Sequence, residues 1–363
     1  MTVRLSTLSA WMLVCGLVTI RSVASAQATI RFRATADSLQ LPSPEEGIFS
    51  VPFRYRGVTP SPSEDPTFVN FLLVTPSSGV GGTRIAIGLN PNVVPYLPTG
   101  SYSLVLSFTF DPPLQPFVRF VTLLILPSPP PTVTSVVNSA TRQPTISPGC
   151  LVSIFGSNIG TPPVNGRYDD AGIYPKLLGH STVTFNGVPA HLLYVSNGQI
   201  DAVVPFEVAG QNSVDVVVRH RDQTSPTMQV LFSDTSPGIF TVSQDGRGQG
   251  AILNADNSFN SDSNPVRRGS FVQIFATGGG RWNPDLPSGS IYGGPVAPVA
   301  RAPVSVKIGG QPALILYAGV APFLVGKLQV NVAVPEGVSS GEQPIELTVG
   351  ASTSNREVTI AVE

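Results

Sequence analysis

Apolar and polar residues alternate with a period of two through most of the chain. SVDVVVR at 213–219, SVKIGG at 305–310 and PIELTVG at 344–350 follow this pattern. CLVSIFG at 150–156 is apolar on both alternating sets, which predicts a strand that is covered on both faces. No stretch carries a convincing stripe with the 3.6-residue period of a helix, so the pattern predicts many short strands and an all-β fold.

One apolar phrase occurs twice in the second half of the chain. Pro189, Tyr194 and Gln199 in FNGVPAHLLYVSNGQIDAVVPF (185–206) recur in the same order as Pro312, Tyr317 and Gln329 within 308–335. The spacing between equivalent residues grows slowly along the chain, as loop insertions would produce. We therefore expect two copies of one β unit. The shared tyrosine is expected to cap the core, and the shared glutamine to satisfy backbone groups at the next turn.

Turn and linker signals divide the chain into blocks. LPSPPPTV at 126–133 is a stiff spacer that cannot lie within a sheet, and SDTSPGIF at 233–240 is a weaker break. Asn186-Gly187 and Gly309-Gly310 lie between β-rich runs, where tight hairpins need positive φ angles.

The N-terminus reads as a signal peptide. Arg4 precedes an apolar stretch, and Ala24 and Ala26 form the small-residue pattern after which signal peptidase cuts. We expect cleavage before Gln27 and export of the remaining chain. No later stretch is apolar for the roughly 18 residues that a membrane-spanning helix needs, so no membrane span is expected.

Composition supports strands and argues against nucleic acid as a partner. Charged residues make up only 12% of the 363, whereas Gly (35) and Pro (36) are abundant, which suits strands and turns. Removal of Arg4 and Arg21 with the signal lowers the basic residues from 21 to 19, against 22 acidic residues. Cys150 is then the only cysteine, so no internal disulfide forms, and we interpret it as a packed side chain rather than a reactive thiol.

The residues from 131 to 363 resemble a known family. PGCLVSIFG at 148–156, VTFNGVPA at 183–190, SPGIF at 236–240 and QVNVAVP at 329–335 are similar to the C-terminal domain of many exported Acidobacteria proteins, first catalogued from Solibacter. That resemblance implies no activity. Each half is also similar to IPT/TIG domains, which implies an immunoglobulin-like fold. The opening ISPGCLVSIFGSNIG (146–160) matches that family well, whereas VRRGSFVQIFATGGG (266–280) is less typical.

The N-terminal block, 72–110, resembles the BACON-type immunoglobulin-like domain. The matching residues are Val74, Pro76, Gly79, Pro98, Gly100 and Tyr102. Such domains are associated with carbohydrate-active proteins. This chain has Phe71 to Leu73 where that family usually carries a tryptophan, which weakens the implied link.

Catalytic signatures are missing from the sequence. The histidines His180, His191 and His220 have no metal-binding spacing, and neither a G-x-S-x-G elbow nor a phosphate-binding loop occurs. We therefore expect no cofactor and no enzymatic activity.

Two loops contain candidate binding residues. The loop 253–265 places Asp256, Asn260 and Asp262 close together, as a calcium site would, but it lacks the EF-hand glycine and glutamate and also reads as an Asx-rich hairpin. In the loop 278–295, Arg281, Trp282 and Tyr292 could hold a sugar or a protein partner. The alternative is that Trp282 folds back over the sheet edge.

Together these patterns predict an all-β protein of tandem immunoglobulin-like β-sandwiches. The expected parts are a signal peptide (1–26), a BACON-like domain (27–127) and two IPT/TIG-like sandwiches (128–232 and 233–363). The expected function is non-catalytic binding, adhesion or scaffolding in a secreted or extracytoplasmic location, with an extracellular protein or a glycan as partner. The alternatives are a carbohydrate-binding accessory protein of an exported polysaccharide-processing system and, third, an unrecognised hydrolase.

Overall fold

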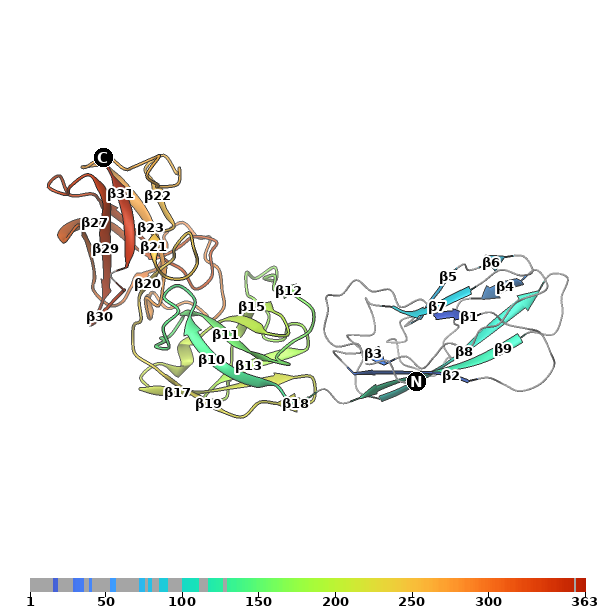
Figure 1. Ribbon diagram of the computed structural model, residues 1–363. Coiled ribbons are helices and arrows are strands. Elements are labelled where there is room, and N and C mark those ends of the chain that lie inside the picture. Colours follow the sequence, from blue (N-terminus) through green and yellow to red (C-terminus); the bar gives the residue numbers. More distant parts are fainter. Residues whose placement is uncertain are drawn as a thin grey trace. The chain divides into compact units, whose positions relative to one another are not determined.

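The protein is built almost entirely from β-strands (Figure 1). The structure, a computed structural model, describes residues 129–363 apart from Arg356, together with Asn90 and the strands that precede residue 127. The chain divides into two compact units, 1–129 and 130–363. The described residues contain no α-helix and no helix long and apolar enough to cross a membrane. The prediction of an all-β fold is confirmed.

The N-terminal unit has two sheets in its described strands. One has the order β1-β7-β5 and the other β3-β2-β9-β8-β4-β6, in which β2 and β9 are parallel. Most of the predicted signal peptide lies outside the described residues. Of the BACON-like motif, Val74, Gly79, Gly100 and Tyr102 lie in described strands, whereas Pro76 and Pro98 lie outside the described residues. The strands are β1 (Gly16–Val18), β2 (Thr29–Thr35), β3 (Leu39–Gln40), β4 (Phe53–Arg56), β5 (Leu72–Thr75), β6 (Ser78–Gly79), β7 (Ile85–Leu89), β8 (Gly100–Phe110) and β9 (Phe117–Leu126).

The first sandwich has the strand order of an immunoglobulin fold. One sheet runs β10-β11-β16-β15-β12, and the other runs β14-β13-β17-β18, with β19 also on β17. In chain order this is the ABED sheet packed on the CFG sheet. The elements are β10 (Thr132–Asn138), β11 (Leu151–Ser157), β12 (Val164–Asn165), β13 (Ser181–Phe185), β14 (Val188–Pro189), β15 (His191–Val195), β16 (Gln199–Val203), the 3-10 turn η2 (Phe206–Val208), β17 (Ser213–His220), β18 (Gln223–Thr224) and β19 (Met228–Leu231).

The second sandwich repeats this arrangement, with its two sheets joined through one strand. The order is β20-β23-β28-β27-β26-β29-β31-β21, and β22 also pairs with β23. The start of β27 pairs with β26 and its remainder with β28, so this strand passes from one sheet to the other. The strands are β20 (Gly238–Ile239), β21 (Gly248–Gln249), β22 (Ile252–Asn254), β23 (Phe271–Thr277), β24 (Trp282–Asn283), β25 (Val299–Ala300), β26 (Val304–Ile308), β27 (Gln311–Val320), β28 (Leu328–Ala333), β29 (Gly341–Val349), β30 (Ser352–Thr353) and β31 (Val358–Val362).

The predicted period of two gives each sandwich its own core. Alternate residues of β17 and β28 are buried, and their neighbours face outward. The two cores are separate clusters of aliphatic side chains, one within 136–232 and one within 239–362. In β11 both alternating sets are buried at its start, as the sequence predicted for CLVSIFG.

The two sandwiches are copies of one unit in their strand register. Phe155 lies opposite Gln199 in β11 and β16, and Phe275 lies opposite Gln329 in β23 and β28. The hairpins β13-β14 and β26-β27 turn at the predicted positions, where Gly187 has φ 80° and Gly310 has φ 79°. The predicted internal repeat is confirmed.

The role expected for the shared glutamines was wrong in one respect. Gln199 Nε2 donates to Asp201 Oδ1 at 2.9 Å, and Gln329 Nε2 donates to Asn331 Oδ1 at 3.0 Å. The amides therefore bond to side chains rather than to backbone groups. The reason is that residues two apart on a strand project from the same face.

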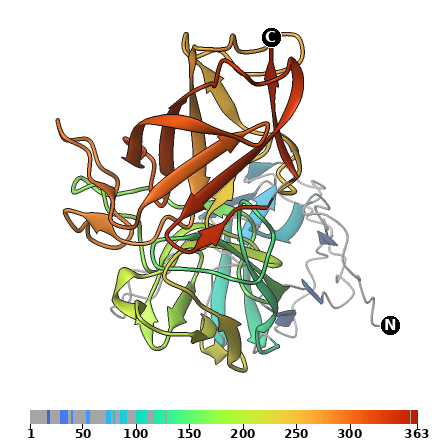
Figure 2. The same ribbon diagram turned by 90° about the vertical axis from the view of Figure 1, so that its left-hand side faces the viewer.

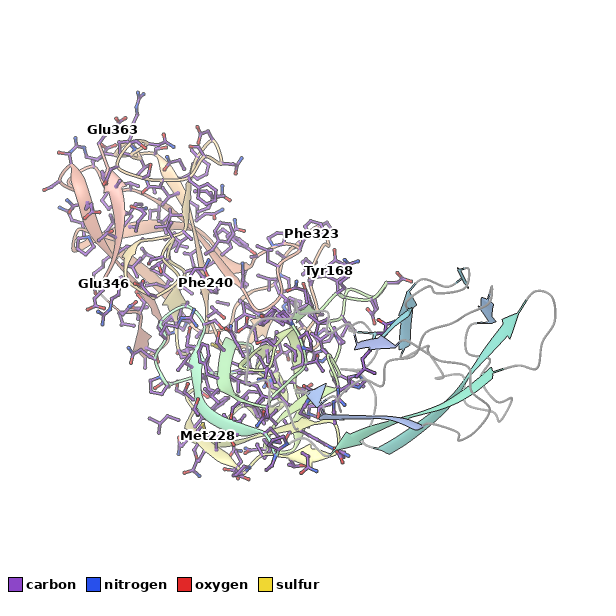
Figure 3. The ribbon with its side chains drawn as sticks, turned by 45° about the vertical axis from the view of Figure 1, so that its right-hand side comes forward. Tyr168, Met228, Phe240, Phe323, Glu346 and Glu363 are labelled. Carbon is purple, nitrogen blue, oxygen red and sulfur yellow. The ribbon has the colours of Figure 1, made fainter. Side chains whose placement is uncertain are left out.

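The two sandwiches lie against each other (Figure 2) and meet through a small apolar cluster and buried hydrogen bonds. Leu151 and Val203 of the first sandwich pack on Val325 of the second. Phe240, which is labelled in Figure 3, lies beside them. The backbone N–H of Leu151 donates to the buried Thr277 Oγ1 at 2.8 Å, which in turn donates to the Gly326 carbonyl at 2.8 Å. These contacts make residues 130–363 one compact unit.

Candidate functional site

The aromatic loop of residues 278–295 turns its tryptophan inward. Trp282 is 5% exposed and belongs to the core of the second sandwich, held there by the pairing of β24 with β25. The Tyr292 hydroxyl donates to the Val296 carbonyl at 2.6 Å, and its ring packs on the same core. Arg281 lies on the surface, 3.3 Å from Asp285 Oδ2. The three candidates therefore do not form an aromatic platform.

The loop of residues 253–265 separates its calcium candidates. Asn260 is 2% exposed; it accepts from the Ala361 backbone N–H at 2.8 Å and donates to the Ala361 carbonyl at 2.9 Å. Asp256 accepts from the Ser258 hydroxyl and backbone N–H, and these hydrogen bonds lower the pKa of its carboxyl. Asp262 is exposed. In the described part of the chain, no group of three or more acidic, histidine or cysteine side chains could hold a metal ion.

A serine and a histidine lie in contact, but inside the first sandwich. Ser181 Oγ is 2.9 Å from His220 Nδ1, and it donates to the Ile159 carbonyl at 2.8 Å. Both residues are almost completely buried. Burial, followed by the charges of Arg221 and His180, lowers the pKa of His220 to about 4. This pair is closed to a substrate and carries a neutral imidazole whose Nε2 has no hydrogen-bond partner within the described residues, so it belongs to the packing of the core.

The remaining reactive side chains lie apart from one another. His191 is covered by the backbone at Gly289, and its Nδ1 is in contact with the Tyr174 carbonyl. Burial raises the pKa of the Cys150 thiol to about 12, which keeps it protonated and unreactive. The described residues therefore bring no nucleophile, base and acid together in an open cleft.

A groove of about 260 Å³ lies where the sandwiches meet, and its charges are paired. Arg247 forms an ion pair with Glu357 at 2.8 Å, and Arg142 Nε donates to the Gln244 carbonyl at 3.0 Å. Arg142 and Gln244 belong to different sandwiches, so their hydrogen bond links the two, whereas Arg247 and Glu357 both lie in the second sandwich. These contacts leave little charge for a ligand. The groove is lined by Thr141, Arg142, Gln143, Asp245, Arg247, Asn355 and Glu357.

The outward side of the sheet β22-β23-β28-β27 differs from all these places. Its inward residues, such as Val272, Val330 and Val332, are fully buried, whereas Leu314 is 69% exposed and Leu316 56% exposed. Phe271 of β23, Ala333 of β28 and Leu314 of β27 form one row across the sheet. We call this surface the outer face, and its residues are Leu253, Phe259, Phe271, Gln273, Phe275, Leu314, Leu316, Tyr317, Gln329, Asn331 and Ala333.

Amide side chains form a second row beside the apolar row. Gln273 Nε2 donates to Asn257 Oδ1 at 2.8 Å, and Gln329 Nε2 lies 3.3 Å from Gln273 Oε1 and 3.0 Å from Asn331 Oδ1. Within the described residues, the Asn331 amide nitrogen has no hydrogen-bond partner. None of the residues of the outer face carries a charge at neutral pH. The surface therefore offers apolar contacts and amide hydrogen bonds, and it has no charged side chain to attract or repel a partner.

The equivalent positions of the first sandwich are covered by protein. Leu151, Val203 and Leu193 stand where the second sandwich has Phe271, Ala333 and Leu316, and they pack on Val325 and Ile291. These positions of the second copy are not among the candidate binding residues predicted from the sequence. The signal was the run ALILY at 313–317, which is apolar on both faces of a strand.

Comparison with known proteins gives a likeness in fold class only. No family model matches the chain, and no curated protein matches it. Among solved structures, the chain is similar to SGBP-B of the Bacteroides ovatus mixed-linkage glucan utilization locus, in complex with a mixed-linkage heptasaccharide (12% identity, 99% of this chain, 71% of that chain, TM-score 0.28). It is also similar to Drosophila N-cadherin EC1-3 (10%, 93%, 98%, TM-score 0.27) and the I9-I11 tandem of titin (9%, 93%, 97%, TM-score 0.22). TM-scores this low carry no functional argument.

Proposed function

We propose that this protein is an exported, non-catalytic binding protein for adhesion or scaffolding, and that the outer face of its second sandwich is the contact surface. The observation that carries the proposal is the exposure of Leu314 and Leu316 on β27, which pairs with β28 before and after the bulged residue Leu316. A contiguous exposed apolar surface on a rigid element marks an interaction site more often than scattered apolar residues do.

The energetics of the outer face suit binding. The backbone of β28 is held by hydrogen bonds to strands on both sides, and that of β27 by hydrogen bonds to β28, so a partner would bind a surface that is already ordered. Burial of the exposed leucines and of Phe271 would supply the hydrophobic part of the binding free energy. The amide row would orient the partner through hydrogen bonds, because each amide carries both donors and acceptors.

The cellular location in this proposal depends on the sequence. The signal peptide read from residues 1–26 sends the chain out of the cytoplasm, and the absence of a second mature cysteine leaves stability to the two cores. An extracytoplasmic scaffold of serial β-sandwiches fits these features.

A neutral polysaccharide is the second candidate partner. The specific observation in its favour is the amide row, with Asn331 open to a ligand hydroxyl and Phe271 beside it. Uncharged hydroxyls match an uncharged face, whereas an acidic glycan would find no cation among the residues of the outer face.

A retention experiment tests the proposal. Purified full-length protein is applied to immobilised cellulose, xylan and chitin, and to a surface that carries the same protein. We expect retention on at least one of these, and its loss in the double variant Leu314→Ser/Leu316→Ser. The control is Leu177→Ser/Leu231→Ser, which removes two equally exposed leucines from the first sandwich. Equal retention of the Leu314→Ser/Leu316→Ser variant would exclude the outer face as the site.

A further inference from the structure

We infer that the partner of the outer face is the same face of a second copy, so that the protein forms an isologous dimer through its second sandwich. This inference rests on the proposed function, because it names the partner of that site. In an isologous contact each copy contributes the same residues around a two-fold axis, which is the commonest symmetry of protein dimers.

The first sandwich shows that this sheet face is used for protein contact in this chain. Leu151 is 6% exposed because the second sandwich covers it, whereas Phe271, its counterpart, is 37% exposed. The residues at the two β-bulges differ in exposure in the same way: Leu193 packs in the interface between the sandwiches, whereas Leu316 is exposed to solvent. Within the described residues nothing covers the second copy of this surface.

The internal contact cannot simply be extended to a further sandwich of the same kind. In the second sandwich the loop 321–327 between β27 and β28 supplies Val325 to the interface, but the equivalent loop of the first sandwich is only residues 196–198. Phe206 packs on the core of the second sandwich, and Glu336 stands at its equivalent position. A head-to-tail contact would therefore lack both its loop and the apolar ring of Phe206.

Strand addition would use only a short stretch of β27. This strand pairs with β28 on one side, and on the other it pairs with β26 at 311–313 and with β25 at Gly319, which leaves only residues 314–318 at an edge. We therefore infer a partner that lies flat on the side chains of the sheet, where Leu314 and Leu316 are exposed. Stacking of two sheet faces is the ordinary way in which β-sandwiches bury such a surface.

The chemistry of the outer face is self-complementary. Two copies bring no like charges together, although the exported chain as a whole has more acidic than basic residues. Each copy offers the free amide nitrogen of Asn331 as donor and the Gln329 amide oxygen as acceptor, so both can be satisfied across a two-fold axis. A strongly charged partner would find no opposite charge among the residues of the outer face.

Sedimentation of the full-length protein tests the inference directly. We expect the wild type to pass from monomer to dimer as concentration rises, and Leu314→Ser/Leu316→Ser to remain monomeric at every concentration. Leu177→Ser/Leu231→Ser should dimerise like the wild type. Circular dichroism confirms that each variant is folded.

A cysteine variant tests the symmetry of the contact. In a Cys15→Ser background the native Cys150 is buried, so Leu316→Cys provides the only accessible thiol. An isologous contact brings the two introduced thiols near one axis, and mild oxidation should give a covalent dimer. Leu177→Cys, equally exposed on the first sandwich, should not cross-link.

The outcomes separate this inference from the proposed function. A wild type that remains monomeric and a Leu316→Cys variant that does not cross-link would overturn the dimer. If the Leu314→Ser/Leu316→Ser variant then still loses retention on a polysaccharide, the binding function stands with a glycan as partner. A dimer that survives in that variant also overturns the inference, because its interface lies elsewhere. If neither retention nor dimerisation depends on the outer face, both proposals are wrong.

Discussion

Leu193 and Leu316 occupy the same position in the two sandwiches, yet one lies in an interface and the other on the surface. Each is the extra residue of a β-bulge, opposite the step from Ala202 to Asp201 in one copy and from Val332 to Asn331 in the other. Leu193 packs beside Val325, whereas Leu316 is 56% exposed. The two environments differ because of what lies above the sheet, since the backbone that carries both leucines is the same.

Thr277 is expected to couple the two sandwiches. Thr277→Val keeps the shape of the side chain but leaves the Leu151 N–H and the Gly326 carbonyl without their hydroxyl partner. Each unpaired buried group costs about 1–3 kcal/mol, so the loss of both partners should lower the free energy of unfolding by roughly 2–6 kcal/mol. Urea unfolding followed by circular dichroism measures the change. Thr348→Val, which removes an exposed hydroxyl, should cost less than about 0.5 kcal/mol; an equal effect of the two variants would contradict the coupling.

Trp282 is expected to act as a core residue. Trp282→Ala should lower the free energy of unfolding by about 3–5 kcal/mol, because it opens a cavity in the second sandwich. The other tryptophan, Trp11, lies in the predicted signal peptide, so in protein prepared without residues 1–26 the emission of Trp282 should be blue-shifted and poorly quenched by acrylamide. A red-shifted, readily quenched emission with unchanged stability would instead place this ring on the surface.

Asn260 is expected to stabilise the fold through its hydrogen bonds rather than to bind calcium. Asn260→Asp keeps the bond from the Ala361 N–H but replaces the amide donor with a buried negative charge beside the Ala361 carbonyl. The loss should be about 3–5 kcal/mol, as for an unpaired buried charge. Calorimetry of the wild type with calcium and with a chelator should give equal Tm values. A calcium-dependent rise in Tm that disappears in Asp256→Asn/Asp262→Asn would show that this loop binds calcium.

Much of this fold follows from period and repetition in the sequence. The alternation in SVKIGG and SVDVVVR predicted strands with one buried face, and the paired tyrosines and glutamines predicted two copies. These features are local or are repeated, so one chain is enough to read them. The Asn186-Gly187 and Gly309-Gly310 turns were equally readable, because their positive φ angles restrict the residues that can occupy them.

The candidate contact surface could not be read in the same way. Trp282 was predicted from its residue type as a possible binding group, but whether a loop ring turns in or out depends on the edge pairing of β24 and β25. The outer face depends on a comparison of environments, since only the packing of the second sandwich on Leu151 shows which copy is covered. The sequence alone shows apolar residues at the same positions in both sandwiches, so it does not distinguish the covered copy from the exposed one.

The last expectation concerns pH and the buried imidazole of His220. Its pKa is lowered from 6.5 to about 4, mainly by burial, and its Nε2 has no partner within the described residues that could stabilise a proton there. Between these two values the unfolded chain binds a proton at this site and the folded chain does not. Lowering the pH through that window therefore favours unfolding, and the contribution is fully present only above about pH 6.5.

The expected loss from His220 alone is about 3 kcal/mol between pH 7 and pH 4, since each pKa unit corresponds to about 1.4 kcal/mol. His220→Asn retains a group that can bond to Ser181 but does not titrate, so it should flatten the dependence. Burial also lowers the pKa values of His180 and His191, and their asparagine variants should remove smaller parts of the slope. Urea unfolding from pH 7 to 4.5 avoids the range in which Asp245 and Asp256 titrate, because hydrogen bonds lower their pKa values below 3.8. An undiminished slope in His220→Asn would show that the loss comes from another group.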